Sequence, residues 1–310
     1  MKHLRLLAIV LGLLLLGPVA GCNKQTSSKP SPTPADTVAP VLSTERILET
    51  LGNTPHGYSL YLVKVGQSAS VKKRTFLQGT DKSERIPLAF TFYVIRGEGK
   101  TILVDTGFTD KKMIEKWHVE GHRSPVDALK LLGIDPEDVT DIIVTHRHWD
   151  HIGGVPLFPN AKIFIPRSEF QSAVKGYQKS NPDLADALEQ SADSHRVQFT
   201  KIVDSPLPGI VVVREGKHTG SFQYVVVRNK EHLWVLPSDV CPLYENLHGP
   251  TSSGLTKDAK ASRKALSRML KLAQGHGDRV VPSHDPVAFD RFPQAADGIA
   301  IITDRPKPTT

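Results

Sequence analysis

Apolar runs alternate with helically spaced apolar positions through most of the chain. β-branched and apolar runs predict strands in the first half at residues 91–96, 101–104, 141–145 and 161–165. The Gly97-Glu98-Gly99-Lys100 segment between the first two runs is typical of a hairpin turn. Helical spacing occupies residues 111–118 and 124–132, and the second of these begins with a serine and an aspartate in capping-box spacing.

The second half of the chain has a similar outline. It predicts strands at residues 209–214, 222–227, 233–236 and 279–281, and a long helix at residues 258–274. One strand in each half is followed closely by an acidic residue, Asp105 in the first half and Asp239 in the second. Strands that alternate with helices around a layered core indicate an α/β architecture.

The start of the chain has the pattern of a targeting signal. Lys2 and Arg5 precede residues 6–16, which are apolar apart from one glycine and too short for a membrane-spanning helix of about 20 residues. The run ends in Gly17-Pro18-Val19-Ala20-Gly21-Cys22, which resembles the bacterial lipoprotein signal. We therefore expect residues 1–21 to be a signal peptide and Cys22 to be lipidated. An ordinary cleaved signal is the alternative.

The signal is followed by a segment unsuited to folding. Residues 22–44 are rich in Ser, Thr and Pro and are expected to form a disordered tether, and residues 45–305 a single folded domain. A lipid on Cys22 would anchor the protein to a membrane in the bacterial cell envelope, facing outward from the cytoplasm. In a Gram-negative cell this places it at the outer membrane or on the periplasmic side.

Composition narrows the class of protein. The 310 residues are 39% hydrophobic and 23% charged, which excludes disordered, collagenous and polytopic membrane proteins. Two cysteines exclude a disulfide-rich scaffold, and lipidation of Cys22 would leave Cys241 as a lone thiol, which we expect to pack in the core. The net charge of +7 is spread along the chain, so nucleic acid is not an expected partner.

The chemistry is concentrated directly after the predicted strand at residues 141–145. His146 and His148 stand two residues apart on extended chain, so they point the same way and can share a metal ion. Asp150 and His151 follow the turn and can face a second ion or a metal-bound water. The alternative is a polar loop of hydrogen-bonded histidines. Zinc is the first expectation for His and Asp ligands, although Mn, Fe or Co also suit them.

This HxHxDH motif resembles that of the metallo-β-lactamase-fold hydrolases, and the resemblance extends over essentially the whole folded region. It implies a four-layer αββα sandwich with further metal ligands at His218, Asp239 and His284. One ion would then be held by His146, His148 and His218, and a second by Asp150, His151 and His284, with Asp239 bridging them. Asp105 would support the site from behind the ligands.

The resemblance also implies a mechanism. A hydroxide shared by two divalent ions is a nucleophile near neutral pH, and the ions polarise the scissile carbonyl. Asp150 would orient that hydroxide or carry its proton. Phe108, Trp117 and Trp149 would either line an apolar acyl pocket or simply pack.

Three stretches resemble the quorum-quenching N-acyl-homoserine lactonases, namely residues 132–140, 158–161 and 244–247. A small lactone is therefore the expected substrate. Two positions depart from that branch: Gly216-Lys217 replaces a Pro-Gly before His218, and Pro242 stands where a tyrosine holds the lactone carbonyl. Tyr244, two residues further on, is the candidate to replace that tyrosine.

Other activities remain open at this stage. The same scaffold could cleave a thioester, as in glyoxalase II, or a β-lactam, although a bridging Asp239 is unlike the β-lactamase branches. A non-catalytic binding lipoprotein is a third reading, against which the complete set of seven ligand positions argues. The sequence does not predict an oligomeric state.

Overall fold

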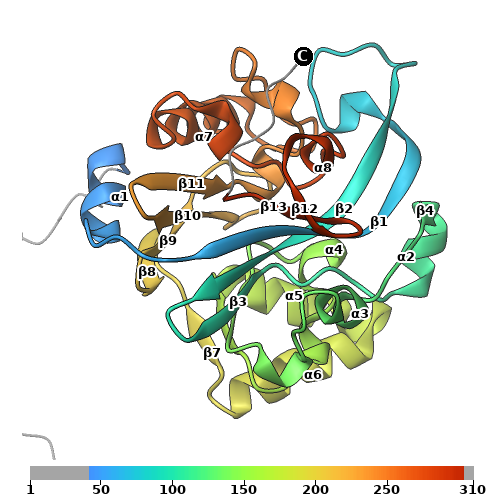
Figure 1. Ribbon diagram of the computed structural model, residues 1–310. Helices are drawn as coiled ribbons and strands as arrows, with labels where there is room; N and C mark the ends of the chain where they lie inside the picture. Colours follow the sequence, from blue (N-terminus) through green and yellow to red (C-terminus); the bar gives the residue numbers. More distant parts are fainter. Residues whose placement is uncertain (1–41, 304–310) are drawn as a thin grey trace, which may run out of the picture. The chain divides into compact units, whose positions relative to one another are not determined.

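The computed structural model of the protein describes residues 42–303 (Figure 1). The expected signal peptide, the lipidation site at Cys22 and most of the expected tether lie outside these residues, as do residues 304 and 305. The first described helix, α1 (Thr44–Leu51), is capped by the Ser43 side chain, and Leu42 packs against the core. Within residues 42–303, no helix combines the length and apolar character needed to cross a bilayer.

Two β-sheets form the centre of the domain. The larger has nine strands in the order β12-β13-β1-β2-β3-β5-β6-β7, with β4 paired to β1. Its strands are β1 (Ser59–Lys72), β2 (Arg85–Gly97), β3 (Lys100–Val104), β4 (Val119–Glu120), β5 (Asp141–Ile143), β6 (Lys162–Ile165), β7 (Val197–Phe199), β12 (Gln294–Ala296) and β13 (Ile299–Ile301). The smaller sheet has the order β11-β10-β9-β8, formed by β8 (Val203–Leu207), β9 (Ile210–Arg214), β10 (Gln223–Asn229) and β11 (His232–Leu236).

Helices cover the outer face of each sheet. The remaining helices are α2 (Lys111–Lys116), α3 (Pro125–Lys130), α4 (Trp149–Ile152), α5 (Arg167–Ser180), α6 (Pro182–Asp193), α7 (Ala259–Leu272) and α8 (Ala288–Arg291). Figure 1 shows α1 and α7 against the smaller sheet, and α3 to α6 on the opposite side of the larger one. The four-layer αββα sandwich expected from the sequence is therefore confirmed.

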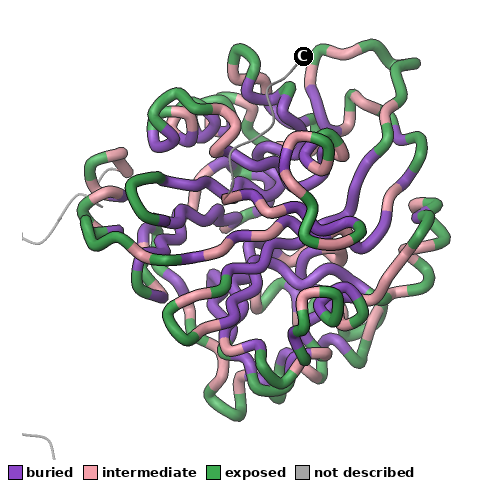
Figure 2. The backbone as a smooth tube through the Cα atoms, in the orientation of Figure 1, coloured by how far each residue is buried: buried purple, intermediate pink, exposed green. Residues whose placement is uncertain are grey.

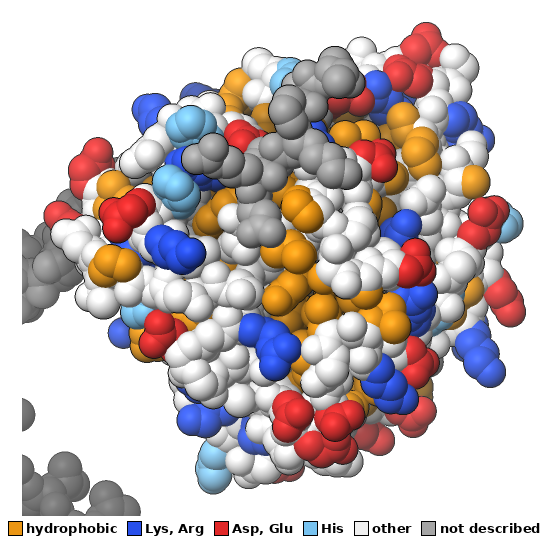
Figure 3. Space-filling view, in the orientation of Figure 1, with side chains coloured by type: hydrophobic (Ala, Val, Ile, Leu, Met, Phe, Trp, Pro, Cys, Tyr) orange, Lys and Arg blue, Asp and Glu red, His pale blue; other side chains and the backbone are white. Residues whose placement is uncertain are grey.

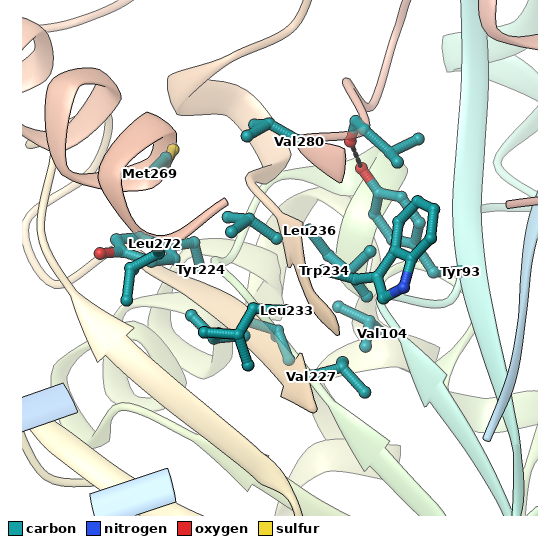
Figure 4. Packing of buried hydrophobic residues seen from close by; sticks show 14 of the residues in the cluster. Tyr93, Val104, Tyr224, Val227, Leu233, Trp234, Leu236, Met269, Leu272 and Val280 are labelled. Carbon is teal, nitrogen blue, oxygen red and sulfur yellow. Dashed lines mark hydrogen bonds between the residues drawn. The ribbon is translucent and has the colours of Figure 1, made fainter. Parts of the chain in front are cut away.

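Alternate residues of the central strands fill two apolar cores. On β2, Tyr93 and Ile95 pack towards the smaller sheet, whereas Phe92 and Val94 pack towards the helices below. Figure 4 shows Tyr93 beside Trp234 of β11, with the Tyr93 hydroxyl donating to the carbonyl of Val281 at 2.8 Å. Burial on both faces explains why these strands are continuous apolar runs. Figure 2 shows the buried backbone running through the middle of the domain. On the face seen in Figure 3, charged side chains of both signs surround a band of hydrophobic ones.

The predicted hairpin is confirmed. Glu98 and Gly99 connect β2 to β3 with φ angles of 51° and 70°, which is the left-handed conformation that a two-residue hairpin loop requires. The predicted helix at residues 111–118 ends at Lys116, because His118 adopts a φ of 49° that a helix cannot continue through. The predicted strand at residues 141–145 ends at Ile143, where the N–H of Thr145 turns to the Asp105 carboxylate.

The prediction of a strand at residues 279–281 is wrong. A single parallel bridge joins Val280 to Val235, and the N–H of Val281 donates to the carbonyl of Val235 at 3.0 Å. Pro282 follows and has no N–H to extend the pairing. The bridge still places this segment beside β11, which matters for the site.

Candidate metal centre

The candidate residues lie where strands of both sheets end. β3 and β5 are parallel neighbours, so Asp105 after β3 and His146 after β5 emerge at the same edge of the larger sheet. His218 lies in the connection between β9 and β10. Asp239 lies in a 3₁₀ turn after β11, and the bridge at Val280 carries the following chain, with His284, alongside that turn.

The seven residues predicted as metal ligands come together in one cluster. They form two groups, and within each group the ligand atoms all lie within 4.8 Å of one another. The groups are His146, His148, His218 and Asp239, and Asp150, His151 and His284. We call these seven residues the ligand cluster, and the two groups the first and second groups.

Asp239 faces both groups with different oxygens. Its Oδ1 lies 2.9 Å from Nε2 of His284 and 3.1 Å from Nε2 of His151. Its Oδ2 lies 3.3 Å from Nε2 of His218 in the first group. A carboxylate in this position can serve two ions at once.

Asp150 lies on the second-group side of the cluster. Its Oδ2 is 3.5 Å from Nε2 of His151 and 3.8 Å from Nε2 of His284. Asp150 also lines the cavity described below, so its carboxylate is available to a molecule bound there.

Hydrogen bonds on the outer side of the cluster orient two of its imidazoles. Nδ1 of His151 lies 2.7 Å from Oδ2 of Asp105, and Nδ1 of His284 lies 2.8 Å from the carbonyl oxygen of Ala89. Both partners only accept, so each Nδ1 carries the proton and donates it. Nε2 of each ring therefore faces the cluster, where a metal ion can take the place of a second proton.

The interior of the cluster fits divalent metal ions. Nδ1 of His148 lies 2.9 Å from Nε2 of both His146 and His218, but one ring nitrogen cannot satisfy two others by hydrogen bonding. Nε2 of His151 is buried without a hydrogen-bond partner among residues 42–303. Converging imidazole nitrogens with carboxylate oxygens form the donor set that zinc and similar ions take.

Burial sets the protonation of the first group. Desolvation, with a contribution from the neighbouring imidazoles, holds the pKa of His146 well below its usual value. Burial likewise lowers the pKa of His148, and that of His218 to about 4. Near neutral pH these three imidazoles are uncharged and keep a lone pair for a metal.

The second group behaves differently. Burial opposes the charged form of His151, but the carboxylates of Asp239, Asp150 and Asp105 outweigh it and raise the pKa of this imidazole. This half of the cluster therefore carries an excess of negative charge that attracts a cation.

An apolar cavity of about 220 Å³ opens onto the ligand cluster. Its polar floor includes His148, Asp150, Asp239 and His284. Its walls are Phe76, Leu88, Phe90, Trp117, Trp149 and Leu255. Trp117 and Trp149 thus line a pocket, whereas Phe108 is fully buried and packs edge-on against Trp149 with 4.5 Å between ring centroids.

Tyr244 does not join the residues that line this cavity. The Tyr244 ring packs in the core, and the guanidinium carbon of Arg291 lies 4.0 Å from the ring centroid. The backbone N–H of Tyr244 donates to the Asp285 carboxylate. Cys241 is buried in the same core.

Asp105 lies behind the ligands, as the sequence predicts. Its carboxylate accepts from His151 and from both the N–H and the hydroxyl of Thr145. Sequence reasoning missed Ser238, whose hydroxyl lies 2.9 Å from that of Thr145. It also missed the walls formed by Leu88 and Phe90, which alternating apolar positions just before residue 91 could have indicated.

Comparison with known proteins agrees with this geometry. The family model described as the metallo-beta-lactamase superfamily matches residues 91–284, more than half of the chain. The chain is 22% identical over 258 residues to an N-acyl homoserine lactonase AttM of Rhizobium johnstonii, covering 77% of this chain and 97% of the relative. It is 23% identical over 274 residues to the N-acyl homoserine lactonase AiiB of Agrobacterium fabrum, covering 80% and 99%.

A solved structure shares the fold. An N-acyl homoserine lactone hydrolase, with the product N-hexanoyl-L-homoserine bound at its catalytic metal center, superposes with a TM-score of 0.64. It has 18% sequence identity, and the match covers 76% of this chain and 96% of that one.

Proposed function

The chain belongs to the metallo-beta-lactamase superfamily, and on that basis we propose that this hydrolase opens lactones such as N-acyl homoserine lactones at a site that holds two divalent metal ions. The observation that carries the proposal is an apolar cavity whose floor includes four residues of the ligand cluster. Such a cavity suits a substrate with a polar reacting group and an apolar tail. Lactonases among the relatives support the same substrate class.

We assign the two ions to the two groups. The first ion would be held by His146, His148 and His218, and the second by Asp150, His151 and His284. Asp239 would bind both ions. Zinc is the first choice, and Mn, Fe and Co suit the same donors. Such ions, when bound, supply a nucleophile near neutral pH and polarise the ester carbonyl.

The protein's own residues do the rest. The walls that include Phe90, Trp117 and Trp149 hold the acyl chain and exclude water from the floor. Ring opening breaks the ester C–O bond, so the departing oxygen needs a proton. Asp150, at the floor of the cavity, is positioned to pass one to it. Tyr244 has no such place in the cavity and would reach the substrate only if the loop around it moved.

Acid release by the purified, zinc-loaded protein tests the proposal. Opening an N-acyl homoserine lactone liberates a carboxylic acid, which a pH indicator reports. We expect release that Asp150→Asn abolishes and Asp141→Asn retains. Asp141 is a buried carboxylate paired with Lys100, outside the ligand cluster, and so makes a matched control. A zinc-loaded protein that leaves lactones intact but cleaves a thioester or a chromogenic β-lactam would overturn the substrate assignment.

The membrane anchor is a separate proposal that rests on the sequence of residues 2–22. A lipid on Cys22 would keep the enzyme in the bacterial envelope, facing outward from the cytoplasm. Metabolic labelling with an alkyne fatty acid should mark the full chain and not its Cys22→Ser variant. Equal labelling of both would refute lipidation at this residue.

A further inference from the structure

A buried carboxylate on α5 connects the two loops that carry the first group. Glu169 is 1% exposed and lies in the first turn of the helix that follows β6. Because β5 and β6 are parallel neighbours, this turn lies at the same sheet edge as the HxH segment. Glu169 is not itself in the ligand cluster.

Each carboxylate oxygen of Glu169 accepts from a different loop. Oε2 accepts from the N–H of Arg147, between His146 and His148, at 3.2 Å. Oε1 accepts from the N–H of Ser221, three residues after His218, at 2.8 Å. One side chain thus sets the distance between the HxH loop and the His218 loop.

Two further contacts tie α5 to the same loops. The hydroxyl of Tyr177 donates to the carbonyl of Arg147 at 2.8 Å, and the hydroxyl of Ser168 donates to that of Ser221 at 2.6 Å. The guanidinium of Arg147 also pairs with Oε2 of Glu169 at 3.2 Å. Three of the contacts made by α5 are to loop backbone, at the N–H and carbonyl of Arg147 and the N–H of Ser221, so they position the loops and not a single ring.

We propose that Glu169 is a positioning residue for the first metal ion, holding His146 and His148 at the correct distance from His218. The inference rests on the metal centre of the proposed function, not on its lactone substrate. Glu169 touches neither metal nor substrate in this scheme and acts through the two loops.

The chemistry of the contact makes Glu169→Gln a sharp test. Both positions facing the carboxylate are N–H donors, so either orientation of the glutamine amide places its NH₂ against one of them. One loop must lose its bond while the side-chain volume is unchanged. Tyr177→Phe is a milder second variant, because it removes a single hydroxyl.

Metal affinity is the readout. Apo protein is titrated with zinc against a chromogenic chelator, and its cobalt form is followed by visible absorption. Wild type should bind two ions. Glu169→Gln should bind one of them about 10–100-fold more weakly, the range typical for lost outer-sphere support, and leave the other unchanged. His218→Ala should perturb the same cobalt band, whereas the matched control Asp141→Asn should keep both ions at wild-type affinity.

Every result decides the proposal. Unchanged binding, or equal weakening of both ions, in a folded Glu169→Gln protein would overturn it. If that variant does not fold, Tyr177→Phe decides, with a smaller selective weakening expected and unchanged binding contradicting the proposal. A wild type that binds two ions without cleaving lactones would refute the lactone substrate and leave this inference standing. A wild type that binds no metal would refute both.

Discussion

Nδ1 of His151 donates to Oδ2 of Asp105 over 2.7 Å, and both side chains are buried. The bond fixes the tautomer of His151 with Nε2 towards Asp239. Asp105 also has a φ of 63°, a conformation that asparagine adopts readily, so Asp105→Asn changes the charge without straining the backbone. We expect the amide to weaken the orientation of His151 and to lower affinity for the second ion about 10–100-fold in chelator competition. Wild-type affinity in this variant would show that Asp105 does not control the ring.

Metal removal should lower thermal stability. Ions that bind only the folded state stabilise it, by about 2.7 kcal/mol at a free concentration of one hundred times Kd. For a domain of this size that corresponds to about 5–10 °C in Tm. Calorimetry of chelator-treated and zinc-reloaded protein measures the difference. Identical melting with and without zinc would contradict a folded-state metal site.

Trp149 should influence which acyl chains are accepted. Trp149→Ala removes a wall of the cavity. The value of kcat/KM for a decanoyl substrate should therefore fall about tenfold, which corresponds to the loss of roughly two buried methylene groups. The value for a butanoyl substrate should change little. Trp234→Ala is the control, because Trp234 packs in the core on the side of the smaller sheet. It should lower stability without changing the ratio of kcat/KM between the decanoyl and butanoyl substrates. The same ratio in all three proteins would remove Trp149 from the acyl site.

Two glycines should respond to alanine with opposite signs. A Cβ at Gly254 would overlap the carbonyl oxygens of Arg74 and Thr75, in the segment that leads to the cavity wall at Phe76. Gly254→Ala should therefore lower the free energy of unfolding by about 1–3 kcal/mol. Gly176 lies inside α5 with open space around it, so Gly176→Ala should raise that free energy by about 0.5–1 kcal/mol. Urea unfolding measures both, and changes of the same sign would refute this account.

Tyr58 should contribute to alkaline unfolding. Burial, with the negative charges of Glu98 and Asp141, raises the pKa of its phenol to about 12, and its hydroxyl donates to the carbonyl of Pro208 at 2.7 Å. The folded state thus holds this proton more tightly than the unfolded chain, where the pKa is about 10. The free energy of unfolding should fall as pH rises from about 10 to about 12, and less steeply in Tyr58→Phe. Equal slopes in urea titrations of the two proteins would argue against it.

The layered architecture and the residues of the ligand cluster could be predicted from the sequence, whereas most of the cavity walls could not. Short apolar strands buried on both faces have a recognisable composition, and His146 to His151 are adjacent in the chain. The walls of the cavity come from distant segments such as Phe76 and Leu255, which meet only after folding. The strand predicted at residues 279–281 is reduced to a single bridge at Val280, because Pro282 has no N–H with which to extend the pairing. Likewise, nothing local marks Glu169, since its two partners are backbone N–H groups of remote loops.

The two halves of the chain each supply part of the ligand cluster. The HxHxDH loop follows a strand of the larger sheet, whereas His218 and Asp239 lie in connections of the smaller one and His284 arrives through the bridge at Val280. No fragment ending before residue 284 contains a complete pair of groups. Capture of the second ion must therefore wait until His284 has been added to a new chain, whereas the first group is complete once Asp239 is in place. A chain truncated before residue 284 would keep every ligand of the first group and lack one of the second, so occupancy of both groups reports that the smaller sheet and the His284 segment have assembled.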